Sequence, residues 1–233
     1  MNTPADIAEA VARASYGRLV AFIATRTGDV AAAEDALSDA FAAALASWPV
    51  QGVPDTPEAW LLTVARRRLI DSGRRSRTSL EAASHLRLLA EEGMSETSAA
   101  VPDDRLALMF VCAHPAIDLA VRAPLMLQTV LGLDAAIIAS AFLTAPATMG
   151  QRLVRAKTRI KLAAIPFRLP ERADLPERLG AVLDAIYAAF AAGWTDPGGT
   201  DVRRRDLAGE AIWLGRLLGR CCRRSRRRWV CWP

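Results

Sequence analysis

Residues 133–160, LDAAIIASAFLTAPATMGQRLVRAKTRI, decide the fold that the rest of the chain is expected to follow. Their apolar spacing predicts two helices joined by a tight corner. Asp134 can cap the first helix, because its short carboxylate accepts the free N–H groups of the opening turn. Thr144 is expected to cap the second helix, and Pro146 fits the first turn, where no N–H partner is needed. The segment is therefore predicted to be a helix-turn-helix.

The second predicted helix has one apolar and one cationic face. The cationic face fits the major groove of DNA, where arginine can hold phosphates or bridge the two acceptors of guanine. The competing interpretation is a surface helix pair with solvated arginines, since helix-turn-helix patterns are common. The apolar face consists of Met149, Leu153, Ala156 and Ile160, and the candidate DNA-binding residues are Thr148, Gln151, Arg152, Arg155, Lys157 and Arg159.

The composition favours helices over strands. Of the 233 residues, 52% are hydrophobic but only 6% are aromatic, because alanine, leucine and valine carry the apolar content, and this mixture is typical of helical proteins. We therefore predict an all-α, cytoplasmic protein without a membrane-spanning segment. No Ser/His/Asp set, metal-ligand cluster, P-loop or dinucleotide-binding turn is present in the sequence, so an enzyme, a cofactor, a metal and a small-molecule substrate are not expected.

The net charge of +5 comes from the last fifteen residues. Residues 219–233, GRCCRRSRRRWVCWP, contain six arginines and no acid, so the preceding 218 residues carry a net charge of −1. A one-base shift in one permitted back-translation of residues 221–232 turns this stretch into an acidic, leucine-rich helical sequence. We therefore predict a frameshift near Gly219 that added a basic tail; the alternative is a genuine arginine-rich nucleic-acid arm.

Two predicted helices lie upstream of the helix-turn-helix. Residues 30–48 place Glu34, Asp35 and Asp39 on the exposed side of a helix, where solvated charges near a helix start are the simpler interpretation. After a loop at 49–57, a helix at 58–72 combines a tryptophan with clustered arginines, which suits unpaired bases and a phosphate backbone. A buried tryptophan with solubilising arginines is the alternative. The candidates here are Trp60, Arg66, Arg67, Arg68, Arg74 and Arg75, and the apolar stripe expected for 30–48 is Leu37, Phe41, Leu45 and Trp48.

Taken together, these segments resemble an RNA polymerase sigma factor of the extracytoplasmic-function (ECF) type, within the sigma-70 family. AEDALSDAFAAALASW and PEAWLLTVARRRLIDSGRR look like region 2 of that family. DDRLALMFVCAHPAI, the helix-turn-helix and QRLVRAKTRIKLAAIPFRLP look like region 4 of a subgroup that carries a helical C-terminal extension. The resemblance covers residues 5–218.

The resemblance implies roles for the candidate residues. Glu34, Asp35 and Asp39 would bind core RNA polymerase, and Trp60 with the arginines of 66–75 would open the promoter −10 element, with the 49–57 loop capturing a flipped base. The helix at 146–160 would read the −35 element of promoter DNA, and an anti-sigma or other regulatory partner would bind the extension. The implied parts are region 2 (1–76), a flexible linker (77–102), region 4 (103–165), the extension (166–218) and the frameshifted tail (219–233).

Two other function classes remain open from the sequence. A helix-turn-helix regulator could bind duplex DNA without polymerase, although it has no use for residues 30–75. A helical protein-interaction module could use only the extension. The sequence also departs from the family pattern, because Ile137 stands where an acid is common and Pro124 predicts a kink or a break inside a helix. Cys112 is expected to be a buried thiol, not a metal ligand.

Overall fold

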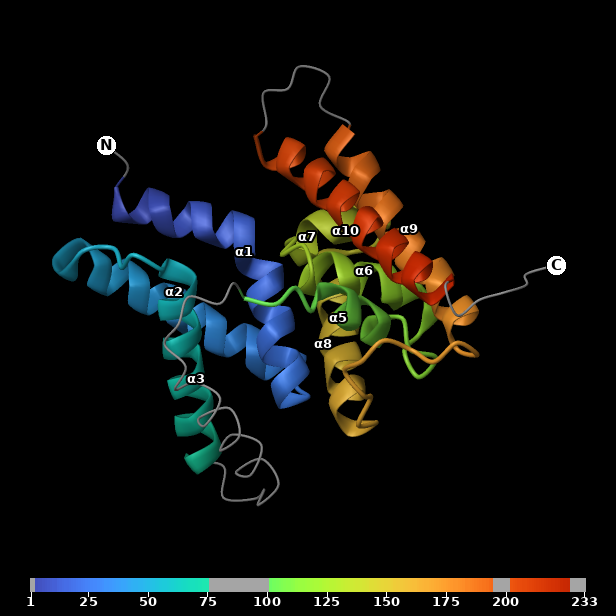
Figure 1. Cartoon of the computed structure of the whole chain (residues 1–233), viewed down its shortest axis with the longest axis horizontal. Helices are drawn as coiled ribbons and strands as arrows, with labels where there is room; N and C mark the ends of the chain where they lie inside the picture. The colour runs from blue at the N-terminus through green and yellow to red at the C-terminus, as the bar shows by residue number, and fades with distance from the viewer. Residues whose placement is uncertain (1–2, 76–100, 195–201, 227–233) are drawn as a thin grey trace.

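The computed structural model describes residues 3–75, 101–194 and 202–226, and no strand occurs among them. The all-α prediction is confirmed. The two groups of helices are called here the N-terminal bundle (α1–α3) and the C-terminal bundle (α5–α10). In chain order the helices are α1 (Pro4–Thr27), α2 (Val30–Gln51), α3 (Pro57–Arg75), α5 (Arg105–Cys112), α6 (Leu119–Thr129), α7 (Ala135–Ala141), α8 (Pro146–Leu162), α9 (Leu175–Trp194) and α10 (Val202–Arg226) (Figure 1).

A glycine and an aspartate make the corner between α1 and α2. Gly28 has a φ of 68°, in the left-handed region that ends helices, and its N–H donates to the Ala24 carbonyl. The Asp29 carboxylate then accepts from the Ala32 N–H at 3.1 Å and caps α2. This corner folds α2 back along α1 (Figure 1).

The buried face of α2 is made largely of alanine. Trp48 and Leu37 are buried as predicted, but Leu45 is 53% exposed, so its place in the predicted stripe is wrong. The buried stripe of α2 instead consists mainly of small side chains spaced three or four residues apart. Their small size lets α1 and α3 approach α2 closely. Those buried alanines are Ala33, Ala36, Ala40 and Ala44.

Pro49, which was predicted to begin a loop, and Pro124, which was predicted to kink or break a helix, both lie inside helices. α2 continues past Pro49 to Gln51, and the Gly52 N–H closes its last turn on the Trp48 carbonyl at 3.0 Å. α6 likewise passes through Pro124, whose ring is buried. Burial of this apolar ring offsets part of the lost backbone hydrogen bond.

The helix-turn-helix forms from α7 and α8. Asp134 caps α7 by accepting from the Ala136 N–H at 2.7 Å, as predicted. The Thr144 cap is wrong: the hydroxyl donates to the Phe142 carbonyl, and Ala145 is the residue that precedes α8, without a side-chain cap. The chain reverses at Leu143, with a φ of 50°, which places Thr144 inside the corner. The predicted apolar stripe of α8 is buried at all four positions, Met149, Leu153, Ala156 and Ile160.

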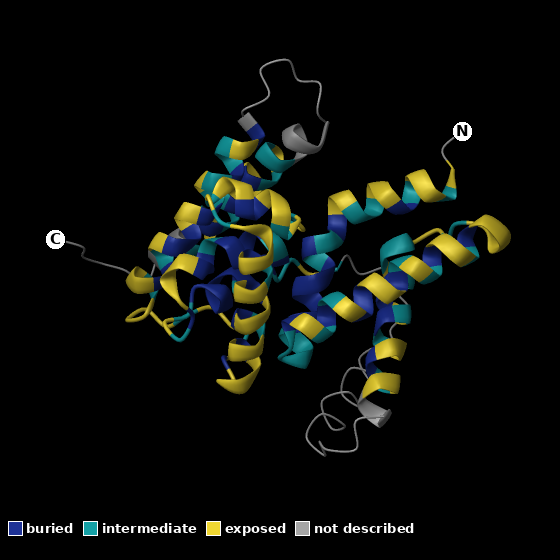
Figure 2. Cartoon of the chain, turned by 180° about the vertical axis from the view of Figure 1, so that it is seen from behind, coloured by how far each residue is buried: buried dark blue, intermediate teal, exposed yellow. Residues whose placement is uncertain are grey.

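The two bundles share one core. Buried apolar side chains of α1 and α2 belong to the same continuous cluster as those of α5, α6 and α8. In Figure 2 the helices carry buried residues, coloured dark blue, on both sides of the contact between the bundles. Residues 77–100 of the predicted linker lie outside the described part of the chain, so the flexible linker stays a prediction.

We expect Leu125→Ala to lower the free energy of unfolding by about 2–5 kcal/mol, because Leu125 is fully buried in α6 and truncation leaves a cavity. Leu119→Ala is the matched control in the same helix, since Leu119 is 72% exposed. Urea unfolding of both variants checks this. Equal effects of the two substitutions would contradict the described core.

Candidate polymerase and nucleic-acid interfaces

The acidic side of α2 is divided between solvent and the C-terminal bundle. Asp35 and Asp39 are exposed, as predicted for residues that meet a partner. The Glu34 side chain is only 15% exposed, and its Oε2 accepts from Lys157 Nζ of α8. Glu34 was predicted to lie in the polymerase interface and Lys157 in the DNA interface. The structure pairs these two residues with each other.

The candidate DNA-binding residues of α3 follow a partly buried tryptophan. The Trp60 ring packs edge-to-face against the buried Trp48 ring, with ring centroids 5.6 Å apart. Arg67 and Arg68 are exposed, and Arg68 lies 3.9 Å from the Asp39 carboxylate in a solvated ion pair. The Arg66 guanidinium lies 5.5 Å from the centre of the Phe22 ring. Arg74 and Arg75 belong to the last turn of α3, and their side chains are outside the described part of the structure.

The cationic face of α8 is open to solvent. Its apolar stripe packs into the C-terminal bundle, so the opposite face points outward. Lys157 alone among the six candidates is turned towards α2, and its side chain is 11% exposed. The five exposed candidates are Thr148, Gln151, Arg152, Arg155 and Arg159.

Three ionisable groups lie in low-dielectric surroundings near the Glu34–Lys157 pair. Burial raises the pKa of Glu34, and the Lys157 charge and hydrogen bond oppose this only in part. Burial, with the charges of Glu34 and Asp35, raises the pKa of Tyr16. Burial raises the pKa of the Cys112 thiol to about 12, so this thiol is protonated at neutral pH. Desolvation therefore dominates this part of the molecule.

A second polar cluster connects α10 to the start of α5. The Arg105 side chain is 8% exposed and forms ion pairs with Asp103, at 2.8 Å, and with Glu210 of α10. Trp213 of α10 donates from Nε1 to the Asp103 carboxylate at 3.1 Å. Burial alone would raise the pKa of Asp103, but hydrogen bonds from Arg105 and Trp213 hold it below its ordinary value. The extension is thus anchored to residues 103–105 by charge-assisted hydrogen bonds.

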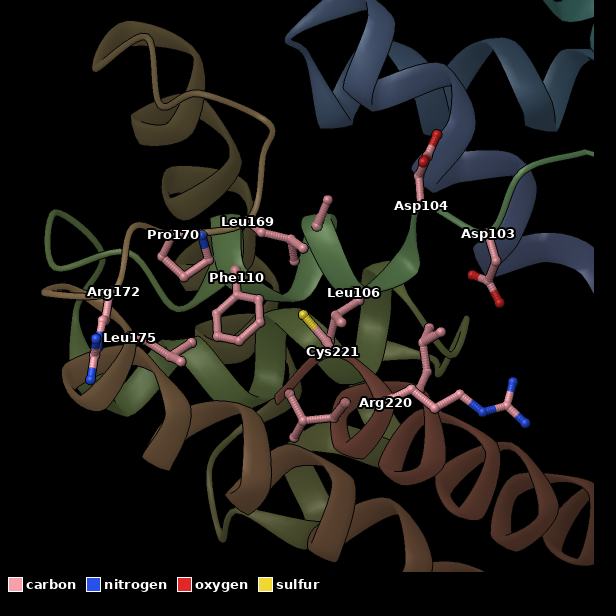
Figure 3. Close-up of a pocket in the computed structure, with 13 residues that line it drawn as sticks. Asp103, Asp104, Leu106, Phe110, Leu169, Pro170, Arg172, Leu175, Arg220 and Cys221 are labelled. Atoms are coloured by element: carbon pink, nitrogen blue, oxygen red, sulfur yellow. The ribbon is translucent and has the colours of Figure 1, made fainter. Parts of the chain in front are cut away.

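An apolar groove of about 640 Å³ lies between α5, the 169–175 segment and the end of α10 (Figure 3). Leu106, Phe110 and Leu175 line its floor, whereas Arg172 and Arg220 point away from it. No sequence pattern indicates this groove, because its walls come from three separate segments.

The described residues contain neither a candidate membrane span nor a candidate metal site. None of the described helices is long and apolar enough to cross a membrane. Within the same ranges, no three His, Cys, Asp or Glu side chains are grouped so that they could hold a metal ion. Cys112 contacts the Thr129 hydroxyl instead, with its Sγ 3.7 Å from Thr129 Oγ1.

Comparison with known families matches both ends of the chain. Residues 11–78 match the model of sigma-70 region 2, which covers most of α1 and all of α2 and α3. Residues 178–229 match a family of unknown function, DUF6596. The N-terminal bundle therefore contains a sigma-70 region 2.

An uncharacterized protein of Rhizobium meliloti (strain 1021) is 41% identical over 192 residues. The match covers 80% of this chain and 45% of the relative, so the chain spans less than half of the relative's length. No solved structure matches the chain significantly.

The match to sigma-70 region 2 covers most of the N-terminal bundle. The matched residues contain both the acidic side of α2 and the arginines of α3. The α7–α8 helix pair lies outside the matched ranges.

We expect Arg105→Met to lower the free energy of unfolding by about 3 kcal/mol at pH 7, because it leaves Asp103 and Glu210 facing each other with little solvent. Arg168→Met is the matched control, since the Arg168–Glu171 pair is exposed and its atoms are 3.9 Å apart. Thermal and urea unfolding measure both. A similar loss in the control would show that the α10 cluster contributes nothing specific.

Proposed function

We propose that this chain is a sigma factor that binds core RNA polymerase and directs promoter-specific initiation of transcription. In this proposal the N-terminal bundle opens the −10 element and α8 reads the −35 element. The observation that carries the proposal is the combination, in one chain, of a sigma-70 region 2 with an outward cationic helix in a helix-turn-helix. A polymerase-independent regulator accounts for the second feature but not for the first.

The division of labour follows from the cost of opening DNA. Extruding a base from the duplex costs a few kcal/mol, so a protein must hold the separated strand to keep it open. α3 offers a tryptophan beside exposed arginines, and stacking with phosphate contacts supplies that holding energy. An upstream anchor on duplex DNA fixes the register, and the face of α8 that carries Arg152 and Arg155 suits that task.

Core polymerase has to meet the chain through a surface that is already exposed. Asp35 and Asp39 meet this condition on α2, whereas Glu34 is engaged by Lys157. Exposed carboxylates attract a basic partner surface and determine its orientation. We therefore propose the Asp35–Asp39 face as the first point of contact with the polymerase.

We expect the purified chain to co-elute with Rhizobium meliloti core RNA polymerase, and the Asp35→Lys/Asp39→Lys variant to lose this binding by at least tenfold, because two attractive charges become repulsive. Asp184→Lys on the exposed side of α9 is the control and should bind normally. Size-exclusion chromatography and fluorescence titration give the affinities. If the original chain folds but ignores core polymerase, the sigma assignment fails for this chain.

We expect Arg152→Ala/Arg155→Ala to weaken binding of the polymerase–chain complex to its selected DNA by tenfold or more, because base or phosphate contacts of arginine each contribute about 1–3 kcal/mol. The DNA would be obtained by selection from a random-sequence library with the original complex. Arg216→Ala, an exposed arginine on α10, is the control. Equal affinity of both variants would remove α8 from the DNA interface.

A further inference from the structure

Two arginines are buried where α9 packs on α6 (Figure 1). Arg122 of α6 is 7% exposed and Arg178 of α9 is 8% exposed. A buried guanidinium loses much of its hydration, and close carboxylates usually offset this cost. Arg105 is equally buried and has such partners, because it binds Asp103 at 2.8 Å and also Glu210. The two arginines between α6 and α9 are not compensated in this way.

The hydrogen bonds of Arg122 go to backbone carbonyls and not to acids. Its Nε donates to the Ile117 carbonyl at 3.0 Å, and its Nη2 donates to the Pro115 carbonyl at 3.4 Å. These bonds hold the turn that precedes α6, but a carbonyl oxygen carries no formal negative charge. Within the described part of the chain, the charge of Arg122 is therefore not neutralised by an ion pair.

Arg178 has one acid near it, and the contact is long. Its Nη2 lies 3.4 Å from Asp174 Oδ2, whereas charge-assisted hydrogen bonds of this kind are usually about 2.7–2.9 Å long. The Asp174 side chain is 54% exposed, so water competes for it. Arg178 Nε is buried and has no hydrogen-bond partner among the described residues. A buried donor of this kind is destabilising unless a ligand or a water molecule satisfies it.

A histidine lies within the electrostatic reach of both guanidinium groups. Burial and the positive charges of Arg178 and Arg122 lower the pKa of His114, which follows the end of α5. The charges of Asp174 and Glu177 oppose this effect, but both acids are exposed. The cations are thus on the buried side of this cluster, and the acids that could balance them are in water.

The hydrogen bond at one nitrogen of His114 makes the other nitrogen a donor. The Ala116 N–H donates to His114 Nδ1 at 3.1 Å, so Nε2 carries the proton of the neutral ring. Pro115 and Asp174 are exposed, so this part of the molecule can be reached from solvent. Two guanidinium groups and an imidazole N–H therefore share one region, and no acceptor of matching charge is buried with them.

We propose that Arg122, Arg178 and His114 form a binding site for a dianionic phosphoryl group, which either inorganic phosphate or a phosphate monoester can supply. A phosphoryl group has at least three acceptor oxygens and about two negative charges, which match two guanidinium groups and an imidazole N–H. A single carboxylate has two oxygens and one charge, and Asp174 accordingly leaves Arg178 Nε unfilled. The site is independent of the roles proposed for α2, α3 and α8.

The titration of His114 tests the site in the unaltered full-length chain. The sequence contains two histidines, so a His85→Gln variant assigns the two imidazole signals in proton NMR spectra. We expect saturating inorganic phosphate to raise the pKa of His114 by about 1 or more relative to NaCl at equal ionic strength, because a nearby dianion favours the charged imidazolium. Sulfate should act in the same direction, since it stays dianionic throughout the titration. An unchanged pKa in both salts overturns the site.

Two substitutions should change the affinity for phosphate in opposite directions. We expect Arg178→Gln to weaken binding about tenfold or more, because it removes a charge and a donor. We expect Asp174→Asn to tighten binding several-fold, because it removes a competing carboxylate, and asparagine is also favoured at the residue that precedes a helix. The controls are Arg168→Gln and Glu171→Gln, which alter an exposed pair nearby and should bind normally. Isothermal titration calorimetry measures all affinities, and urea unfolding confirms that each variant folds.

AMP and adenosine distinguish the two sources of the phosphoryl group. Equal affinities for AMP and inorganic phosphate would show that the phosphoryl group alone is recognised. An affinity for AMP at least tenfold higher, with no binding of adenosine, would assign the site to a phosphate monoester. Either result supports the proposal, whereas adenosine that binds as tightly as AMP overturns recognition of the phosphoryl group.

The remaining outcomes also decide the proposal. Equal phosphate affinities of Arg178→Gln and Arg168→Gln would make the buried arginines structural and overturn the site. Asp174→Asn with unchanged or weaker phosphate binding contradicts the proposed competition, and this exposed position keeps the test available if Arg178→Gln fails to fold. A response of His114 to a short DNA duplex, but not to phosphate, would assign the three residues to a DNA contact and overturn the small-anion site.

Discussion

The closeness with which α1 crosses the end of α6 sets the geometry of the molecule. Gly17 presents backbone alone to the Val130 carbonyl, and any larger residue at that position would force the helices apart. Gly28 and the Asp29 cap then fix the angle at which α2 leaves α1. This geometry places the start of α2 against α8. The glycine at position 17, near the middle of α1, thus determines which charged side chains meet between the two bundles.

Apolar packing and electrostatics contribute differently to the contact between the two bundles. The continuous apolar core supplies the stabilising free energy, because burial of nonpolar area is favourable wherever it occurs. The Glu34–Lys157 pair adds little net stability, since burial raises the pKa of Glu34 despite the neighbouring lysine. What the pair adds is selectivity: only one register of α8 along α2 satisfies both charges. The exposed Arg68–Asp39 pair has neither effect, because water screens it.

Local features such as helix caps and buried stripes could be predicted from the sequence, whereas long-range contacts could not. The helix caps at Asp29 and Asp134 and the buried stripe of α8 depend on residues within a turn or two of each other, so periodicity and capping chemistry predict them. Leu45 was misplaced because alanines, not larger residues, mark the close contacts of α2. Glu34 and Lys157 are 123 residues apart, and no sequence pattern reports such a pairing. Helical spacing correctly predicted which candidate residues of α8 are exposed. The burial of Lys157 could be seen only in the tertiary structure.

One lysine cannot serve two anions at once, and this couples the two proposed interfaces. While Lys157 neutralises Glu34 it is lost to a phosphate, and while Glu34 holds Lys157 it is lost to a basic surface of polymerase. A partner that binds the acidic side of α2 therefore releases a cation on α8. Linkage requires the converse as well: DNA that captures Lys157 raises the affinity of α2 for polymerase by the same factor. Promoter recognition and assembly with polymerase would then favour each other through a single buried ion pair, without any need for a signal to travel through the helices.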